Sequence, residues 1–327
     1  MKDTDFLFLT SMLRARESVM LSKERIGRML DAPDFDDAAK ATVDCGYPDM
    51  SGMNAHQLED AIQEHRNGIF YEIAAFDYSR QLLDFFRLRY DYHNLKVLVK
   101  SKGSDGDFKQ ILSDSGRVSA ETFSEAYLTG DFSDLPKPLA KAMTEAVSVL
   151  SRTGNPQLSD IEIDKAYFEE LLSLAESFDD GFILDYARLL VESANLRTSV
   201  RCARLGRDSG VLLSALIPGG YADMSDIAAS FEGNSLDAFT STELKDAVRL
   251  GIDAMKGGAQ TKFELACDNA ALSYVSNAAL VSFGPAVILA YLAKLEWEVT
   301  AIRMILVGKL MGISSEVIRE RLRDCHV

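Results

Sequence analysis

Three acidic side chains are the best candidates for chemistry in this sequence of 327 residues. They occupy matching positions in three similar segments and are Asp91, Glu192 and Glu298. A carboxyl group beside an apolar surface can have a raised pKa and then serve as a general acid or base. A cation follows each acid five residues later, and buried charges are usually paired. Structural pairing is therefore favoured over a catalytic role for the acids.

The three cations are Lys96, Arg197 and Arg303. At about 100° per residue, position 96 falls inside the apolar stripe of its helix, and position 91 falls just outside the edge of that stripe. A cation on a buried face must be paired, or its long side chain must carry the charge to water. We therefore expect these cations, together with the three acids, to form inter-helix ion pairs or to contact a partner protein, with pairing favoured.

The other motifs do not predict a catalytic, metal or cofactor site. His56, Glu59 and Asp60 share one helical turn, but a single histidine without cysteine is a weak metal pattern, so we expect these side chains to lie on the solvent-exposed surface without a metal. Gly308-Lys309 lacks the earlier glycine and the following Ser or Thr of a phosphate-binding loop. Pro218-Gly219-Gly220 is interpreted as a turn. We expect no catalytic residue, no bound metal and no cofactor.

The elements that carry these residues are predicted to be helices, because strand signals are nearly absent. Residues 56–87 are predicted to form one long helix, and Ser22 and Ser159 are predicted to be N-caps. Clusters of Gly, Pro or Asn predict loops, and they lie at 103–107, 154–156, 218–220 and 284–285. The predicted fold class is all-α.

Three stretches of sequence superimpose in register and indicate an internal repeat. They begin at Leu82, Ile183 and Leu289, offset by 101 and then 106 residues. Their shared apolar positions are spaced by 3, 3, 7 and 4 residues, which traces one stripe of a helix. The repeat predicts three similar helical domains in a pseudo-threefold arrangement, with spans 1–115, 116–222 and 223–327. Whether the C-terminal helices pack back on the first domain stays open.

The composition excludes several classes of protein. A count of 35 Lys and Arg against 50 Asp and Glu gives a net charge of −15, which argues against a nucleic-acid partner. The most hydrophobic window, 278–293, is interrupted by Gly284 and Pro285, so a buried helix is expected there and no membrane span. Four widely spaced Cys and a start unlike a secretory signal predict a cytoplasmic protein.

With these repeats in place, the chain resembles the C subunit of archaeal and bacterial V/A-type ATPases, called the d subunit in the eukaryotic vacuolar enzyme. The resemblance extends over essentially the whole length. Its segments are FLFLTSMLRARESVMLSKERIGRML with the later CGYPD, DYHNLKVLVKSKG, ANLRTSVRCARLG, ALIPGGYADMSDI, and the C-terminal run from FGPAVILAYLAKLEWEVTAIRMILVGKL onward. The order and spacing of these segments together are more specific than any one of them.

The resemblance implies a funnel of three helical domains on the cytoplasmic side of a membrane rotor ring. Such a subunit is a non-catalytic part of the central stalk: it receives the foot of the central axle, binds the proteolipid ring, and transmits torque for ATP-coupled H⁺ or Na⁺ transport. Two alternatives stay open at this point. One is a three-repeat α-helical scaffold unrelated to rotary ATPases, and the other is an α-helical enzyme that uses the three acids Asp91, Glu192 and Glu298.

Overall fold

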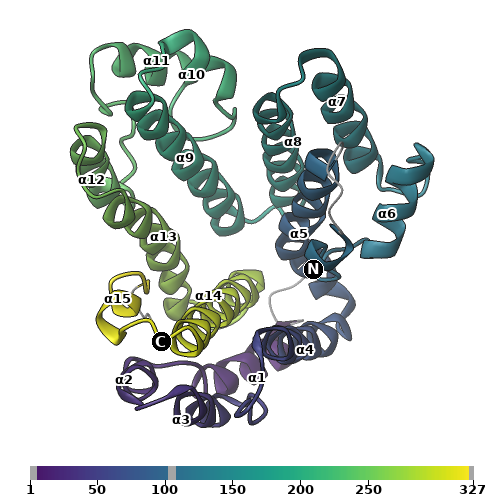
Figure 1. Cartoon of the computed structure of the whole chain (residues 1–327), viewed down its shortest axis with the longest axis vertical. Helices are drawn as coiled ribbons and strands as arrows, with labels where there is room; N and C mark the ends of the chain where they lie inside the picture. Colours follow the sequence, from purple (N-terminus) through teal and green to yellow (C-terminus); the bar gives the residue numbers. More distant parts are fainter. Residues whose placement is uncertain (1–5, 102–107, 324–327) are drawn as a thin grey trace. The chain divides into compact units, whose positions relative to one another are not determined.

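The computed structural model describes residues 6–101 and 108–323, and its regular elements there are helical, so the all-α class is confirmed (Figure 1). The chain divides into two compact units. Unit 1 combines Met1–Leu83 with Thr242–Val327, and unit 2 is Asp84–Ser241. The three-domain spans and the pseudo-threefold funnel stay predictions.

Unit 1 joins helices from both ends of the described chain. Those from the N-terminal part are α1 (Leu7–Glu17), α2 (Lys23–Asp31), α3 (Phe35–Lys40) and α4 (Ala55–Ala74). Those from the C-terminal part are α12 (Lys245–Met255), α13 (Gln260–Ser276), α14 (Pro285–Leu310) and α15 (Ser315–Arg319). Short 3₁₀ turns lie at Ala41–Cys45, Asp77–Ser79 and Asn277–Leu280.

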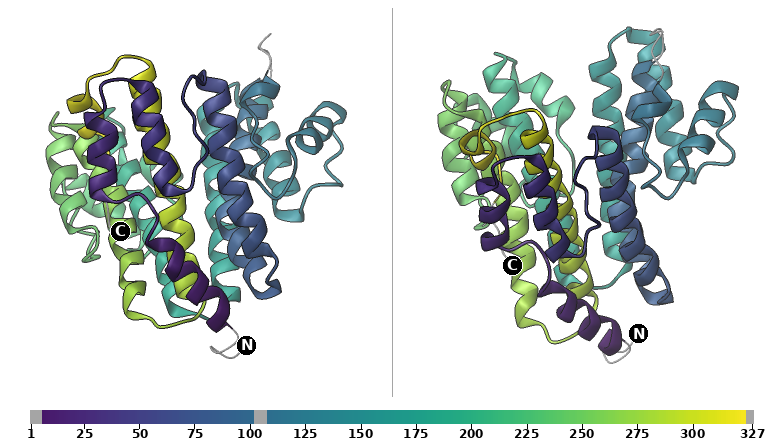
Figure 2. Two further views of the ribbon diagram at one scale, coloured as in Figure 1. Left: turned by 90° about the horizontal axis from the view of Figure 1, so that it is seen from below. Right: turned by 60° about the horizontal axis from the view of Figure 1, so that its bottom comes forward.

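Helix α14 is the centre of unit 1. It packs against α1, α3, α4 and α13, and Figure 2 shows it beside the purple N-terminal helices. Every residue from Ala286 to Val299 is buried, as expected for a helix that is hydrophobic all round. Gly284, with φ +127°, and Pro285 at the first helical position begin α14, so the predicted Gly-Pro entry to a buried helix is confirmed. In the described part of the chain, no helix is long and apolar enough to span a membrane.

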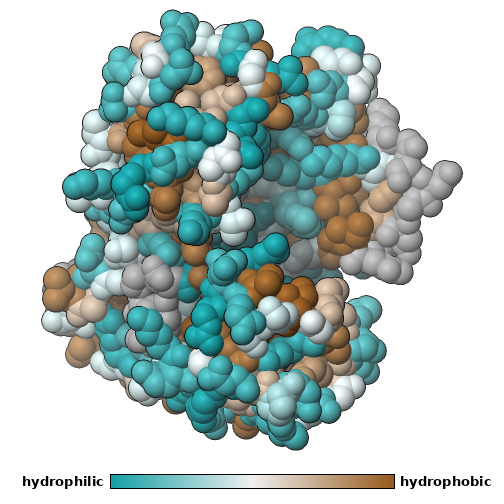
Figure 3. Space-filling view, turned by 60° about the vertical axis from the view of Figure 1, so that its left-hand side comes forward, coloured by the Kyte–Doolittle hydropathy of each residue, from teal (hydrophilic) through white to brown (hydrophobic). Residues whose placement is uncertain are grey.

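Unit 2 contains the other two long repeat helices. Its helices are α5 (Arg80–Ser101, which begins just before the unit border), α6 (Ala120–Thr129), α7 (Lys137–Thr153), α8 (Pro156–Ser177), α9 (Gly181–Arg204), α10 (Ser209–Ala215) and α11 (Met224–Glu232), with a 3₁₀ turn at Phe108–Ile111. Helix α8 packs against both α7 and α9. On the face drawn in Figure 3, apolar side chains form separate small groups among hydrophilic ones.

Two predictions about helix boundaries are wrong. The predicted helix 56–87 is interrupted because Phe76 adopts an extended conformation and the Ser79 hydroxyl donates to the carbonyl oxygens of Ile73 and Phe76. Ser159 is not an N-cap: α8 begins three residues earlier behind Asn155, and the Ser159 hydroxyl donates to the Ala146 carbonyl of α7 at 2.9 Å.

Other boundary predictions are confirmed. The Ser22 hydroxyl accepts the backbone N–H of Arg25 and caps α2. The predicted loop at 154–156 lies between α7 and α8, although Pro156 already belongs to α8, and the predicted loop at 218–220 lies between α10 and α11. The predicted loop at 103–107 lies outside the described residues.

Candidate functional site

The three acids of the repeat are buried in the middle of the three long helices. Asp91 in α5 and Glu192 in α9 are 0% exposed, and Glu298 in α14 is 2% exposed. The cations are the more accessible members, since the Lys96 side chain is 30% exposed and that of Arg303 is 34% exposed. The predicted positions on the helix are therefore reversed. The reason is that a loop covers the acidic side of each helix, and the periodicity of the helix alone carries no information about that loop.

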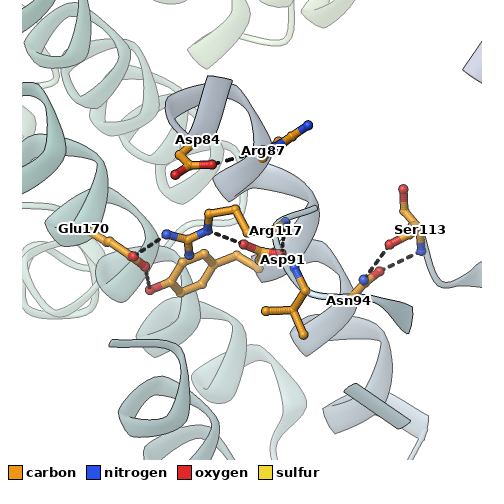
Figure 4. A network of polar contacts seen from close by, with 9 residues as sticks. Asp84, Arg87, Asp91, Asn94, Ser113, Arg117 and Glu170 are labelled. Atoms are coloured by element: carbon orange, nitrogen blue, oxygen red, sulfur yellow. Dashed lines mark hydrogen bonds and ion pairs between the residues drawn. The ribbon is translucent and has the colours of Figure 1, made fainter. Parts of the chain in front are cut away.

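Asp91 holds the loop that precedes α6, as Figure 4 shows. Its Oδ1 accepts the backbone N–H groups of Arg117 at 2.9 Å and Val118 at 3.2 Å. Its Oδ2 accepts Nε–H of the Arg117 side chain at 2.6 Å. The same guanidinium donates from Nη1 to Glu170 of α8 at 2.7 Å. Burial raises the pKa of Asp91, while Arg117 and the two backbone donors oppose that rise.

Glu192 holds the loop that precedes α11 in the same way. Its Oε2 accepts the backbone N–H groups of Tyr221 at 3.0 Å and Ala222 at 3.2 Å. No cation forms an ion pair with Glu192 in the described part of the chain, and its Oε1 has no hydrogen-bond partner there. Burial therefore raises the pKa of Glu192, against the two backbone donors.

Glu298 holds the loop that precedes α2, in the N-terminal part of the chain. Its Oε2 accepts the backbone N–H of Leu21 at 2.5 Å, and its Oε1 accepts the Tyr47 hydroxyl at 3.1 Å. Burial raises the pKa of Glu298 to about 7, against these two hydrogen bonds and the more distant charge of Arg25.

The three sites share one geometry, which we call the carboxylate clamp. In each, the residue just before a helix N-cap donates its backbone N–H to the acid, and the donors are Val118, Ala222 and Leu21. The first two copies add an amide. Asn94 and Asn195 each bond both backbone groups of one loop residue, all at 2.8 Å. The third copy has Ala301 there and joins a C-terminal helix to an N-terminal loop.

Two glycines make room for the clamp in unit 2. A Cβ atom at Gly116 would lie 2.2 Å from Oδ1 of Asp91, and one at Gly220 would lie 2.6 Å from Oε2 of Glu192. Such distances are far inside van der Waals contact, so a side chain at either position would displace the carboxylate. These glycines, each three or four residues before a helix start, are the signal from which the loops could have been found in the sequence.

Two of the three cations link neighbouring helices of their own unit. Lys96 of α5 contacts Asp164 of α8 at 2.5 Å. Arg303 of α14 makes two hydrogen bonds, of 2.6 and 2.7 Å, to Glu59 of α4. Arg197 donates to the Ser193 hydroxyl one turn earlier in α9, at 2.9 Å. Contact of any of these cations with a partner protein stays a prediction.

Sequence reasoning missed a buried ion pair in unit 1. Arg66 of α4, which is 0% exposed, donates to Glu296 of α14 at 3.2 Å and lies 5.0 Å from the centre of the Phe70 ring. No pattern in the sequence marks Arg66, because arginine on a helix is usually solvent-exposed.

The remaining sequence motifs have structural contacts. Nδ1 of the exposed His56 lies 3.0 Å from Oδ2 of Asp60, while Glu59 accepts a hydrogen bond from Arg303. The described residues contain no group of three or more potential metal ligands. Lys309 donates to the carbonyl oxygens of Leu30 at 2.7 Å and Ala32 at 2.6 Å, so it ties α14 to the end of α2 and does not face a phosphate loop.

Comparison with known proteins places the chain in a family. Residues 9–321 match the family model for the ATP synthase (C/AC39) subunit. The chain is 22% identical to the C subunit of the V-type sodium ATPase of Enterococcus hirae, over 97% of this chain and 98% of that protein. It is 23% identical to the C subunit of the V-type ATP synthase of Thermus thermophilus, over 97% and 98%, and 24% identical to the C subunit of the A-type ATP synthase of Thermococcus kodakarensis, over 98% and 90%. With a match that runs through all three clamps, the chain belongs to the ATP synthase (C/AC39) subunit family and is a subunit of a rotary ATPase.

Proposed function

We propose that this protein is a non-catalytic part of the central stalk, a socket that links the axle of the ATPase head to the membrane proteolipid ring. It would lie peripherally on the cytoplasmic face and transmit torque for ATP-coupled transport of H⁺ or Na⁺. The observation that carries the proposal is the family match over residues 9–321, together with whole-length relatives that are named as C subunits.

The clamps support a mechanical role over a catalytic one. A subunit that transmits torque must be rigid. A buried carboxylate that accepts hydrogen bonds from backbone N–H groups fixes a loop to a long helix and so contributes to that rigidity. Both oxygens of Asp91 and one oxygen of Glu192 accept hydrogen bonds from donors of this chain, which favours a structural role for these acids over that of an acid and base aligned on a substrate. The alternative of an α-helical enzyme that uses the three acids is therefore disfavoured.

The net charge of the chain suits the proposed partners. The net charge of −15 would complement a basic axle foot, and electrostatic complementarity aids assembly in the correct orientation. The cations Lys96 and Arg303 are half-buried in ion pairs with exposed edges, so they could contact a partner without leaving their helices. Arg197 occupies the matching position in α9.

The other alternative, a scaffold unrelated to rotary ATPases, is contradicted by the family match. The test of the proposed role is a pull-down of the tagged full chain from membranes of its source, followed by mass spectrometry and an ATPase assay. We expect the nucleotide-binding subunits, the axle subunits and a small proteolipid, with hydrolysis that the isolated chain lacks. Recovery of the head without the proteolipid would contradict the link to the ring, and hydrolysis by the isolated chain would contradict the non-catalytic role.

A further inference from the structure

The acid of the third clamp, Glu298, lines a cavity. The cavity has a volume of about 400 Å³ and lies inside unit 1, between residues of α1, α4 and α14 and the loops around positions 20 and 46. This volume is in the range of sites for small organic molecules. Glu298 is part of its lining, whereas Asp91 and Glu192 are not.

The lining carries more negative than positive charge. It contains three carboxylates, Glu64, Glu72 and Glu298, against one arginine, Arg16. Arg16 is already paired with Glu72. Burial and the nearby Arg16 lower the pKa of the remaining basic group, His65, so this imidazole is neutral at pH 7. Within the described part of the chain, neither the buried Glu298 nor the exposed Glu64 at the edge of the lining forms an ion pair.

Glu298 is the decisive group because only 2% of it is exposed and it has no ion pair in the described part of the chain. Its two hydrogen bonds use only part of the acceptor capacity of a carboxylate, which has about four lone-pair sites. The cation whose charge acts on Glu298, Arg25, donates from Nη1 to the carbonyl oxygens of Ser18 and Met20 instead. A buried carboxylate in this state gains most from a cation that enters from solvent.

Aromatic rings complete the chemistry of the cavity. Tyr291 lines it from α14, and His65 lines it from α4 while stacked on Tyr47, with ring centroids 3.9 Å apart. A flat ring beside a carboxylate suits a guanidinium or an ammonium group, because the ring face attracts the cation and the carboxylate accepts its N–H donors.

We propose that this cavity binds a guanidinium or primary ammonium group on a short carbon chain, with Glu298 as the inner anion and Glu64 as the anion at the mouth. The cation has two sources: a free small molecule, or an Arg or Lys side chain of a partner protein. Binding of a free small molecule does not depend on the proposed function. Binding of a partner's Arg or Lys side chain rests on that function, because it requires the partner protein.

The site predicts a pH dependence. Glu298 binds a cation in its ionised form, so affinity rises as the pH rises through about 7, the value to which burial raises its pKa. A bound cation stabilises the carboxylate and lowers that pKa, so binding below pH 7 releases protons. The titratable and charged groups that face or surround Glu298 are Arg16, Arg25, Cys45, Tyr47, Glu64, His65, Glu72 and Tyr291.

The experiment is calorimetric titration of the isolated full chain at pH 8 and low salt. The probes are agmatine, as a free guanidinium on a short chain, and the blocked tripeptide acetyl-Gly-Arg-Gly-amide, with butylurea as a neutral control. We expect a cationic probe to bind and butylurea not to bind. E298Q and E64Q should each weaken binding at least about tenfold, because each removes a charge partner. E192Q is the matched control, since it alters a clamp acid outside this cavity and should leave affinity unchanged.

A second variant keeps all charges in place. Gly68 lies in α4 on the lining, and a Cβ atom there meets nothing within 4 Å. G68L should therefore fold, and its side chain should reduce binding by filling the mouth of the cavity. This variant tests the proposal independently if E298Q does not fold. Preferential binding of agmatine would identify the ligand of the cavity as a free small molecule, and preferential binding of the peptide would identify it as a side chain of a partner protein. Binding of neither probe at millimolar concentration, or equal binding to wild type and G68L, overturns the proposal, whatever the membrane pull-down recovers.

Discussion

The clamps in unit 2 provide a matched pair of substitutions, D91N and E192Q, for which we expect different losses of stability. Each replaces a fully buried carboxylate by its amide, and each can keep one oxygen for the two backbone N–H donors. They differ in the second oxygen. That of Asp91 accepts Nε–H of Arg117 at 2.6 Å, whereas that of Glu192 has no hydrogen-bond partner in the described part of the chain.

The magnitudes follow from that difference. In D91N an NH₂ group would face the guanidinium, so a hydrogen bond between charged groups is lost, which costs about 1.5–3 kcal/mol of unfolding free energy. In E192Q no ion pair is lost. The two backbone hydrogen bonds remain with a weaker, neutral acceptor, and the removal of a buried ionised group offsets that weakening, so the free energy should change by less than about 1 kcal/mol in either direction.

Urea unfolding followed by circular dichroism measures both effects, and both residues lie in unit 2, so they report on the same unit. Amide hydrogen exchange adds a local measurement. Protection of the N–H groups of Arg117 and Val118 should fall in D91N, while that of Tyr221 and Ala222 should persist in E192Q. An equal loss of stability in the two variants would refute the assignment of the ion pair as the difference between the clamps.

Three further predictions concern single contacts. Burial raises the pKa of Glu298 to about 7 from an ordinary value of 4.5. Ionisation of this buried group should therefore lower the free energy of unfolding by about 3 kcal/mol above pH 7 and by nothing below pH 4.5. In urea titrations, the stability of the wild type should fall relative to that of E298Q as the pH rises from 4.5 to 7. G116A should destabilise the fold, because the added Cβ would lie 2.2 Å from Oδ1 of Asp91. G68A should stabilise the fold by up to about 1 kcal/mol, because Gly68 lies within a helix and a Cβ there meets nothing within 4 Å. Equal melting temperatures of the two variants would contradict the steric argument. R303E breaks a half-exposed ion pair with Glu59 and should lower the free energy of unfolding by no more than about 1 kcal/mol. A large loss of axle binding with unchanged stability would show that Arg303 belongs to the partner surface. Rescue of binding by the added substitution E59R would show instead that Arg303 acts through the link between α4 and α14.

The sequence was sufficient for the fold class and for the repeat. The described part of each aligned stretch lies in one long helix, α5, α9 or α14, because helical periodicity depends only on the local order of apolar residues. The Gly-Pro start of α14 and the Ser22 cap were also predictable, since both depend on residues within one turn. The break at Phe76 was not, because the pattern of apolar residues continues through it and a serine hydroxyl and tertiary packing of the Phe76 ring decide the conformation.

The sequence by itself determined that Asp91, Glu192 and Glu298 are equivalent, and the match of the whole chain to a family is likewise a property of the sequence. Only the tertiary structure decided what each acid does. The loop partners of Asp91 and Glu192 lie 26 to 30 residues away, and the partners of Glu298 lie 251 and 277 residues away, all outside the aligned stretches. Burial depends on those covering loops, so one repeated position produced an ion pair in the first copy, a carboxylate without a cation in the second, and the wall of a cavity in the third.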